Sequence, residues 1–147
     1  FVNIEEELHT CKAYLDIMSV RYHDKFEYSI SCDRNITQFK CPKLILLPLA
    51  ENSIYHGIKG LKYKGNINIT VGQDEDNILF KVSDNGFGID MDNLNHILND
   101  ETDNNHHFAL KHINRILKLY YGNDYRLDFE NKNPGCSISF KIKKEFL

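Results

Sequence analysis

The sequence lacks the features that mark several large classes of protein. No apolar run approaches the roughly 20 residues that a membrane-spanning helix needs, and no charged and apolar leader precedes a cleavage site. The formal net charge of -3 lacks the basic excess that nucleic-acid binding normally requires, so proteins or small anions are the expected partners. No internal repeat and no linker rich in glycine, serine or proline is present, which favours one domain over residues 1–147.

Cysteine pairing motifs are also missing. The four cysteines, Cys11, Cys32, Cys41 and Cys136, are far apart in the sequence and include no C-x-x-C pair. A chain of 147 residues with 41% hydrophobic content can build a core without disulfide bonds. We therefore expect reduced thiols in a cytosolic domain. The chain begins at Phe1 with a helical pattern following almost at once, which favours a segment cut from a longer protein.

The spacing of apolar residues predicts three main helices. From Ile4 to Tyr22 apolar residues recur in steps of three and four, and Asn3 with Glu6 fits a capping box at the start. A second helix is expected from about residue 48 to 57, with Pro48 in its first turn. The third runs from about 108 to 121. Its expected core residues are Leu110, Ile113, Leu117 and Tyr120.

The second helix has two distinct faces. Ala50, Ile54 and Ile58 share one face by i,i+4 spacing, and this face should enter the core. Asn52 and His56 share another face, which should border a cavity.

Period-two alternation predicts five strands, at 26–32, 67–71, 78–82, 125–129 and 138–142. The middle pair should form a hairpin with a loop of about five residues, 73–77, and the last pair a closing hairpin around the turn 132–135. A short helix is expected at 92–98, followed by a polar segment, 99–107, that should be mobile. The sum is an α+β two-layer sandwich of about five largely antiparallel strands and three helices.

Two short motifs carry the chemistry. The first, at residues 47–57, reads L-P-L-A-E-N-S-I-Y-H-G and places a carboxylate beside an amide on the second helix. The second, at residues 84–89, reads D-N-G-F-G-I and ends a strand in an acidic turn broken by glycines. In this order and spacing they indicate an ATP site rather than a solvated helix and an ordinary turn.

The two motifs resemble the Bergerat-type ATP-binding fold of the GHKL superfamily, which includes sensor histidine kinases, type II topoisomerases and heat-shock chaperones. The chain is most similar to the catalytic domain of LytS/YesM-type sensor histidine kinases, with their P-x-L-x-L-Q-P-L-V-E-N-A-x-x-H-G and D-N-G-x-G-I motifs. The resemblance covers nearly the whole sequence. It extends to Tyr14-Leu15, Arg21-Tyr22, Arg115-Ile116, Tyr121-Gly122 and Pro134-Gly135-Cys136.

The resemblance implies roles for the first motif. Glu51 would act as the base that accepts or positions a proton near the γ-phosphate of ATP. Asn52 would supply an amide oxygen to Mg²⁺, a hard ion that keeps phosphates and waters as its other ligands. His56 would lie near the phosphates, although a histidine satisfied by a local carbonyl at the helix end is an equal alternative.

For the second motif, the resemblance makes Asp84 the acceptor of a hydrogen bond from the adenine amine. Guanine would present an oxygen there and leave both acceptors unpaired, at a cost of roughly 1–3 kcal/mol. Gly86 and Gly88 would let the backbone approach the nucleotide closely, with Ile89 beside it.

A third, glycine-rich motif of the family is altered. In its place the chain has His107, Phe108, Ala109 and Leu110, and Cys136 stands where a threonine is usual. The resemblance assigns all five to the nucleotide site, with lower ATP affinity expected because the phosphate-cradling glycines are missing. Two metal-site alternatives compete here: a site of Asp100, Asp103, His106 and His107, and a calcium site of Asp90, Asp92 and Asp100. Both have unfavourable spacing.

The function implied is transfer of the ATP γ-phosphoryl group to a histidine on an upstream dimerising helix, for relay to a response regulator. The parent protein would be a homodimeric bacterial membrane sensor with this domain in the cytoplasm and without direct contact to membrane or nucleic acid. A nucleotide-sensing or scaffolding domain without turnover is the alternative. An ATP-hydrolysing machine of the topoisomerase kind fits less well.

Overall fold

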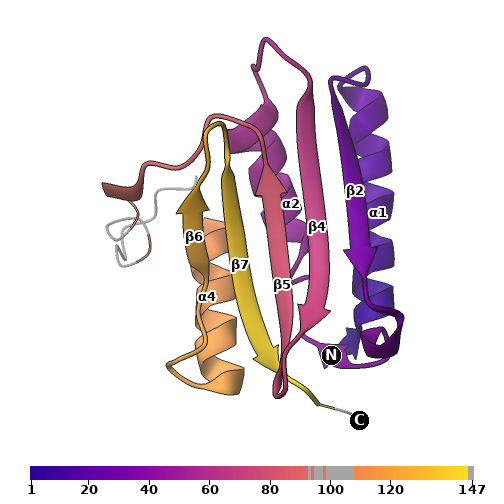
Figure 1. Ribbon diagram of the computed structural model, residues 1–147, viewed down its shortest axis with the longest axis vertical. Helices are drawn as coiled ribbons and strands as arrows, with labels where there is room; N and C mark the ends of the chain where they lie inside the picture. Colours follow the sequence, from indigo (N-terminus) through magenta and orange to yellow (C-terminus); the bar gives the residue numbers. More distant parts are fainter. Residues whose placement is uncertain (93, 95–97, 99–107, 146–147) are drawn as a thin grey trace.

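The computed structural model describes residues 1–92, 94, 98 and 108–145. Its centre is a five-stranded sheet in the spatial order β2 (Phe26–Cys32), β4 (Gly65–Gln73), β5 (Asn77–Asp84), β7 (Cys136–Lys143) and β6 (Asp128–Asn131) (Figure 1). β2 pairs with β4 in parallel, whereas every other pair in this sheet is antiparallel. The mixed, largely antiparallel sheet predicted from the sequence is confirmed.

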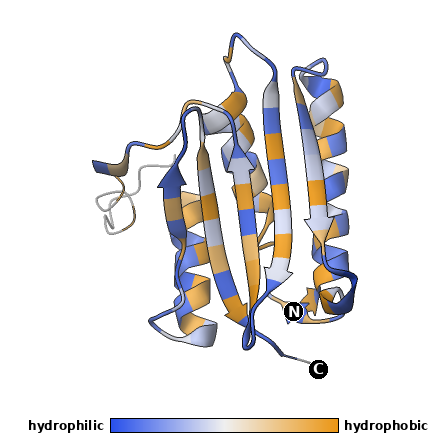
Figure 2. Cartoon of the chain, in the orientation of Figure 1, coloured by the Kyte–Doolittle hydropathy of each residue, from blue (hydrophilic) through white to orange (hydrophobic). Residues whose placement is uncertain are grey.

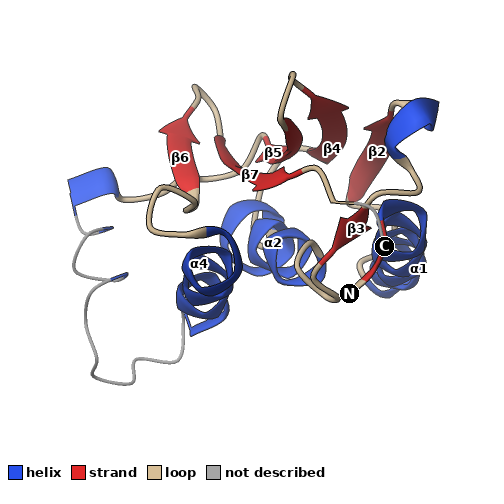
Figure 3. Ribbon diagram, turned by 90° about the horizontal axis from the view of Figure 1, so that it is seen from below, coloured by secondary structure: helices blue, strands red, loops and turns tan. Residues whose placement is uncertain are grey.

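Three helices cover one face of this sheet and make the second layer (Figure 3). They are α1 (Ile4–Arg21), α2 (Leu47–Asn52) with its π-helical continuation η2 (Ser53–Ile58), and α4 (Phe108–Tyr121). A short 3-10 helix, η1 (Arg34–Ile36), and a ladder of two-residue strands, β1 (Val2–Asn3) with β3 (Lys40–Cys41), complete the described elements. None of the described helices is long and apolar enough to cross a membrane.

The core lies between the two layers and is built from buried residues of both. Apolar and polar residues alternate along the strands (Figure 2). In β4 the side chains of Ile67, Ile69 and Val71 are buried while the residues between them are more exposed. Phe80 of β5 stacks on Phe140 of β7, with ring centroids 4.7 Å apart. One face of the sheet is therefore apolar and covered by the helices, the arrangement that period-two patterning predicts.

Several local expectations were wrong. Asn3 precedes α1 but makes no capping bond from its side chain, because its amide donates to Gln38 instead. Tyr120 is 54% exposed, and its neighbour Tyr121 enters the core in its place. The hairpin loop is shorter than expected, because Gln73 and Asn77 belong to the strands and Asp74 closes the turn by accepting the backbone N–H groups of residues 76 and 77.

The last hairpin also begins later than the alternation predicted. β6 starts at Asp128, because Tyr125 is held in a turn by its N–H bond to the Gly122 carbonyl at 3.0 Å. The Leu127 N–H then donates to Oδ1 of Asn114 on α4 at 3.0 Å rather than to a neighbouring strand. Of the short helix expected at 92–98, Asp92, Leu94 and Leu98 are helical and the rest lies outside the described residues, as does the polar segment 99–107.

A buried carboxyl group anchors the start of α2. Glu7 lies on the core face of α1 and is 2% exposed. Its Oε2 accepts the N–H of Leu44 and its Oε1 accepts the N–H of Leu46, both at 2.9 Å. Leu44 has a φ of 60°, a left-handed conformation that a leucine rarely adopts. Glu7 thus holds α1 to the strained entry of the helix that carries Glu51 and Asn52.

We expect Glu7→Ala to lower the free energy of unfolding by about 3 kcal/mol, because one buried and one partly buried N–H group lose their acceptor. Glu6→Ala is the matched control, since Glu6 is exposed in the same helical turn. It should change stability by less than about 0.5 kcal/mol. Urea titrations followed by circular dichroism measure both values, and equal losses in the two variants would contradict the anchoring role.

Candidate functional site

The helix formed by α2 and η2 presents the first motif. Pro48 lies in its first turn, and Ala50, Ile54 and Ile58 are buried, as predicted. Glu51 and Asn52 are half-buried and His56 is exposed, on the sides that leave the core. From Ser53 the helix is π-helical rather than α-helical: the Lys59 N–H bonds to the Ile54 carbonyl at 2.9 Å. Such π segments are rare and occur often at functional sites.

A cavity of about 160 Å³ lies between this helix and the start of α4. Five residues that the sequence assigned to the site line it: Glu51, Asn52, His56, Ala109 and Leu110. Pro48 and Tyr55 complete the lining. The fold thus brings the first motif together with part of the altered third motif, about fifty residues later in the chain.

Tyr14 of α1 lies close to this cavity. Burial, followed by the negative charge of nearby Glu51, raises the pKa of the Tyr14 hydroxyl, which is therefore a neutral donor. This hydroxyl is fully buried and has no hydrogen-bond partner among the described residues. Tyr14 is among the positions that resemble the kinase family, but the sequence predicted no role for it.

The second motif forms a separate cluster at the end of β5. Asp84 is 5% exposed, and its Oδ1 accepts the Gly86 N–H at 2.9 Å. Cys136, its partner in the β5–β7 register, lies with Sγ 3.6 Å from Oδ2 of Asp84. Burial and the charge of Asp84 raise the pKa of the Cys136 thiol to about 12, so the S–H group stays protonated and donates. Cysteine can thus supply here the weak donor that a threonine hydroxyl would supply.

Gly57 joins the two clusters. A Cβ atom at Gly57 would lie 2.9 Å from Cγ of Asp84, and one at Gly86 would lie 2.0 Å from the Gly57 oxygen. The Phe87 N–H donates to that same oxygen at 3.0 Å. The end of η2 therefore packs directly on the glycine turn, and only glycine fits at both contact points.

The turn is held from its other side by residues that sequence reasoning missed. Asn131 of β6 accepts the Ile89 N–H at 2.9 Å and donates to the Ile89 carbonyl at 2.7 Å. Gly135 has a φ of 98°, and a Cβ there would lie 1.9 Å from the backbone carbonyl oxygen of Asp84. Gly88, as predicted for a close turn, has a φ of 82°. Only the turn signal at Pro134-Gly135 pointed to any of these missed contacts; Asn131 had no local signal.

The site residues predicted from the sequence also include Phe108 and His107, and the alternative metal sites add further residues. Phe108 is 63% exposed at the first position of α4, where its ring stacks on His112, and it does not line the 160 Å³ cavity. His107 lies outside the described residues, and so do the alternative metal ligands Asp100, Asp103 and His106. Within the described part of the chain, no group of three or more His, Cys, Asp or Glu side chains could hold a metal ion.

Comparison with known families bears directly on these two clusters. Residues 41–145 match the family model described as histidine kinase-, DNA gyrase B- and HSP90-like ATPase, which spans both motifs and all three site segments. The chain belongs to this ATPase family.

Individual relatives agree with the family match. The chain is 31% identical over 146 residues to the sensor histidine kinase YpdA of Escherichia coli, covering 98% of the chain and 25% of that protein. It is 29% identical over 143 residues to the sensor protein LytS of Staphylococcus saprophyticus, covering 96% of the chain and 24% of that protein. The chain thus spans about a quarter of the length of these relatives.

Solved structures show the same fold. The catalytic domain of histidine kinase ThkA superposes with a TM-score of 0.75 at 15% identity, covering 97% of this chain and 95% of that one. A second ThkA structure, in complex with the response regulator protein TrrA, gives a TM-score of 0.75 at 17% identity and covers 97% of this chain and 41% of that one. The two-layer sandwich of histidine kinase catalytic domains is therefore the fold of this ATPase-family chain.

The close contact at Gly57 generates a stability prediction. Gly86→Ala should lower the free energy of unfolding by about 2 kcal/mol or more, because its Cβ would overlap the Gly57 backbone. Gly72→Ala is the control, since a Cβ at Gly72 meets nothing within 4 Å. It should leave stability unchanged or raise it by up to about 1 kcal/mol. Thermal and urea unfolding measure both, and a Gly86→Ala variant as stable as Gly72→Ala would refute the contact.

Proposed function

We propose that this ATPase-family chain is the catalytic domain of a sensor histidine kinase, which transfers the γ-phosphoryl group of Mg-ATP to a histidine. One observation carries the proposal: a carboxylate and an amide, Glu51 and Asn52, line one cavity beside the residues that open α4. The homologous sensor kinases and the shared fold support the same reading.

In this proposal the cavity beside Glu51 and Asn52 holds the phosphates of ATP, and the cluster around Asp84 holds the base. The 160 Å³ cavity is smaller than the roughly 300–1,000 Å³ of a typical pocket for a drug-sized ligand, so it suits the phosphates rather than the whole nucleotide. The base would then lie toward Asp84, whose carboxylate oxygens each keep a lone pair after accepting from Gly86 and Cys136. Gly86 and Gly88 shape the turn beside Asp84, since a Cβ at either would press on Gly57 or Asn131, and Ile89 offers an apolar side chain.

Asn52 fits a magnesium ion on chemical grounds. Asn52 lines the cavity and its amide oxygen is a hard ligand, and a single protein oxygen suffices for an ion that retains waters and phosphates. When bound, Mg²⁺ would neutralise charge on the phosphate oxygens. His56, Ala109 and Leu110 line the same cavity and would contact the phosphates or close over them. We keep His107 and Phe108 as proposed nucleotide contacts on the resemblance alone.

Glu51 is the proposed base. In the transfer step the bond between the γ-phosphorus and its bridging oxygen breaks, and a bond to an imidazole nitrogen forms. The proton that the imidazole loses passes to the Glu51 carboxylate, while ADP carries away the electron pair of the broken bond. The chain's remaining contribution is positioning, which the rigid anchoring of α2 by Glu7 serves.

The parent protein supplies the rest of the proposed system. The acceptor histidine would lie on an upstream helix that also forms a homodimer, and a response regulator would receive the phosphoryl group. The parent would be anchored in a bacterial membrane, with this domain in the cytoplasm. A scaffolding domain without turnover is the competing function, and the altered third motif is what favours it.

The first test separates ATP binding from transfer. In the parent protein, Glu51→Gln should lower autophosphorylation from labelled ATP on the order of 10²-fold or more, because the proton acceptor is lost. ATP affinity of the isolated chain, measured by titration calorimetry, should change by less than about threefold, since the amide keeps the shape of the acid. Unchanged autophosphorylation would remove Glu51 as the base. Undetectable binding of millimolar Mg-ATP to the unmutated chain would favour the scaffold.

The second test concerns recognition of the base. Asp84→Asn should weaken ATP binding by roughly 10- to 100-fold and reduce the preference for ATP over GTP, because an amide can donate to the guanine oxygen. Asn can still accept from the Gly86 N–H, so the turn should persist. Asp128→Asn, exposed on β6, is the control for loss of one charge. A preference for ATP that is equal in both variants would contradict the role of Asp84.

A further inference from the structure

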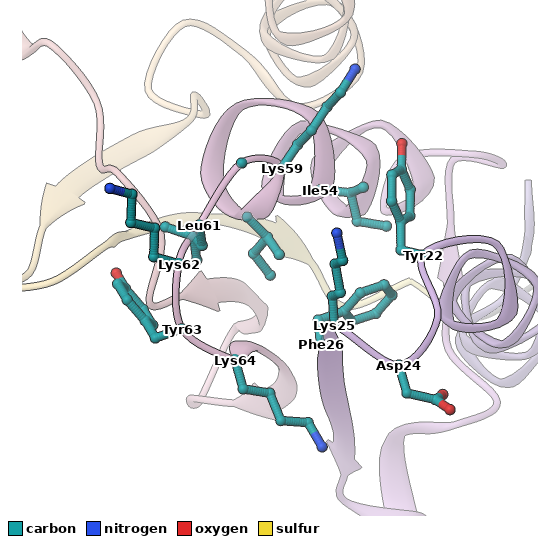
Figure 4. Close-up of a pocket in the computed structure, with 12 residues that line it drawn as sticks. Tyr22, Asp24, Lys25, Phe26, Ile54, Lys59, Leu61, Lys62, Tyr63 and Lys64 are labelled. Carbon is teal, nitrogen blue, oxygen red and sulfur yellow. The ribbon is translucent and has the colours of Figure 1, made fainter.

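A second cavity, of about 530 Å³, also borders η2 and shares no lining residue with the proposed phosphate cavity. It is enclosed by the turn that follows α1, the first residue of β2 and the loop 59–64 that follows η2 (Figure 4). Its floor is apolar and consists of Phe26, Ile54 and Ile58, each no more than 5% exposed. None of the residues assigned to the nucleotide lines it.

The rim of this cavity is strongly cationic. Four lysines line it, Lys25, Lys59, Lys62 and Lys64, against one acid, Asp24. The end of Lys25 points toward the middle of the lining side chains, whereas the ends of the other three lysines point outward (Figure 4). Asp24 extends away from the cavity, and its Oδ1 accepts a hydrogen bond from the Ser19 hydroxyl at 3.0 Å (Figure 4). In a chain with a formal net charge of -3, this is a local reversal of sign. It would attract an anion from solution.

The lysines differ in how free their ammonium groups are. Lys64 lies 3.8 Å from Glu27, and Lys59 lies over the Tyr55 ring at 5.8 Å. Lys25 and Lys62 take part in no ion pair within the described part of the chain. Lys25 extends toward the middle of the group of lining side chains, and its end lies below Ile54 and Tyr22 in this view (Figure 4). It is therefore positioned to meet a charged ligand end while the ligand body lies against Tyr22 and Leu61, two lining residues that keep part of their surface exposed.

We propose that this cavity binds a small amphipathic anion: an aromatic or aliphatic body that ends in one carboxylate, sulfonate or phosphate group. The volume lies within the range of small-molecule pockets, in which apolar walls hold the body and a few polar groups orient it.

The walls of this cavity are bonded to the turn that carries Asp84. The Tyr63 hydroxyl donates to the Asn85 carbonyl at 2.6 Å, one residue beyond Asp84. Gly57, which lies between the floor residues Ile54 and Ile58 in the chain, bonds to Phe87 through its carbonyl. If the proposed function holds, any change that an anion here makes in ATP affinity is matched by an equal change that ATP makes in anion affinity.

The experiment uses this chain and a pair of probes, 1-naphthalenesulfonate and the uncharged 1-naphthalenemethanol, without nucleotide. We expect saturable binding of the sulfonate at one site, with backbone amide NMR shifts concentrated at residues 22–26 and 58–64. Lys25→Glu should weaken it on the order of tenfold, because an attractive charge becomes repulsive. Lys43→Glu, exposed between β3 and α2, should weaken it by less than about twofold, since screening limits remote charges.

The inference is overturned by any of three results. These are equal binding of the charged and uncharged probes, equal binding by the Lys25→Glu and Lys43→Glu variants, or shifts centred on residues 51–56 and 84–89. Binding of phosphatidylglycerol vesicles without binding of the sulfonate would reassign the lysines to a membrane surface. Because no arm of the experiment uses nucleotide, it still tests anion binding at this cavity even if the proposed kinase function is wrong.

Discussion

The Gly57 carbonyl accepts the Phe87 N–H at 3.0 Å, and the carboxyl group of Asp84 lies where a side chain at Gly57 would have to go. This close approach makes one unit of two motifs that are about thirty residues apart in the sequence. It requires glycine on both sides, because a Cβ at either Gly57 or Gly86 would overlap its neighbour. The phosphate cavity along η2 and the acidic turn packed on Gly57 near the end of η2 depend on this contact for their relative position.

The helix that makes this contact is secured at its other end by a buried acid. Glu7 accepts two backbone N–H groups at the entry of α2, so the helix is fixed at its start by α1 and at its end by the glycine turn. A polar group buried in this way is stabilising only while both donors remain paired. A helix tethered at both ends keeps Glu51 and Asn52 in place without relying on the altered third motif, which opens α4.

Local patterns predicted much of the fold because they depend on neighbours in the chain. The bounds expected for the last helix, 108–121, match α4, where apolar spacing and the terminal glycine agree. Local patterns failed where a distant residue decided the outcome. Leu127 bonds to Asn114 of α4, so the strand begins later than alternation suggested. Tyr121 is buried in place of Tyr120, a choice between adjacent aromatics that only the packing partner decides.

The amino-acid order alone determined the two motifs, their spacing and the alternation that builds the sheet, since each is a property of residues close in sequence. From these the ATPase family and its layered fold were predictable. Tertiary structure decided which side chains meet: Asn131 with Ile89 across 42 residues, Cys136 with Asp84 across 52, and four lysines around an apolar cavity. Such meetings depend on how layers pack and strands register, which no local window of the sequence contains.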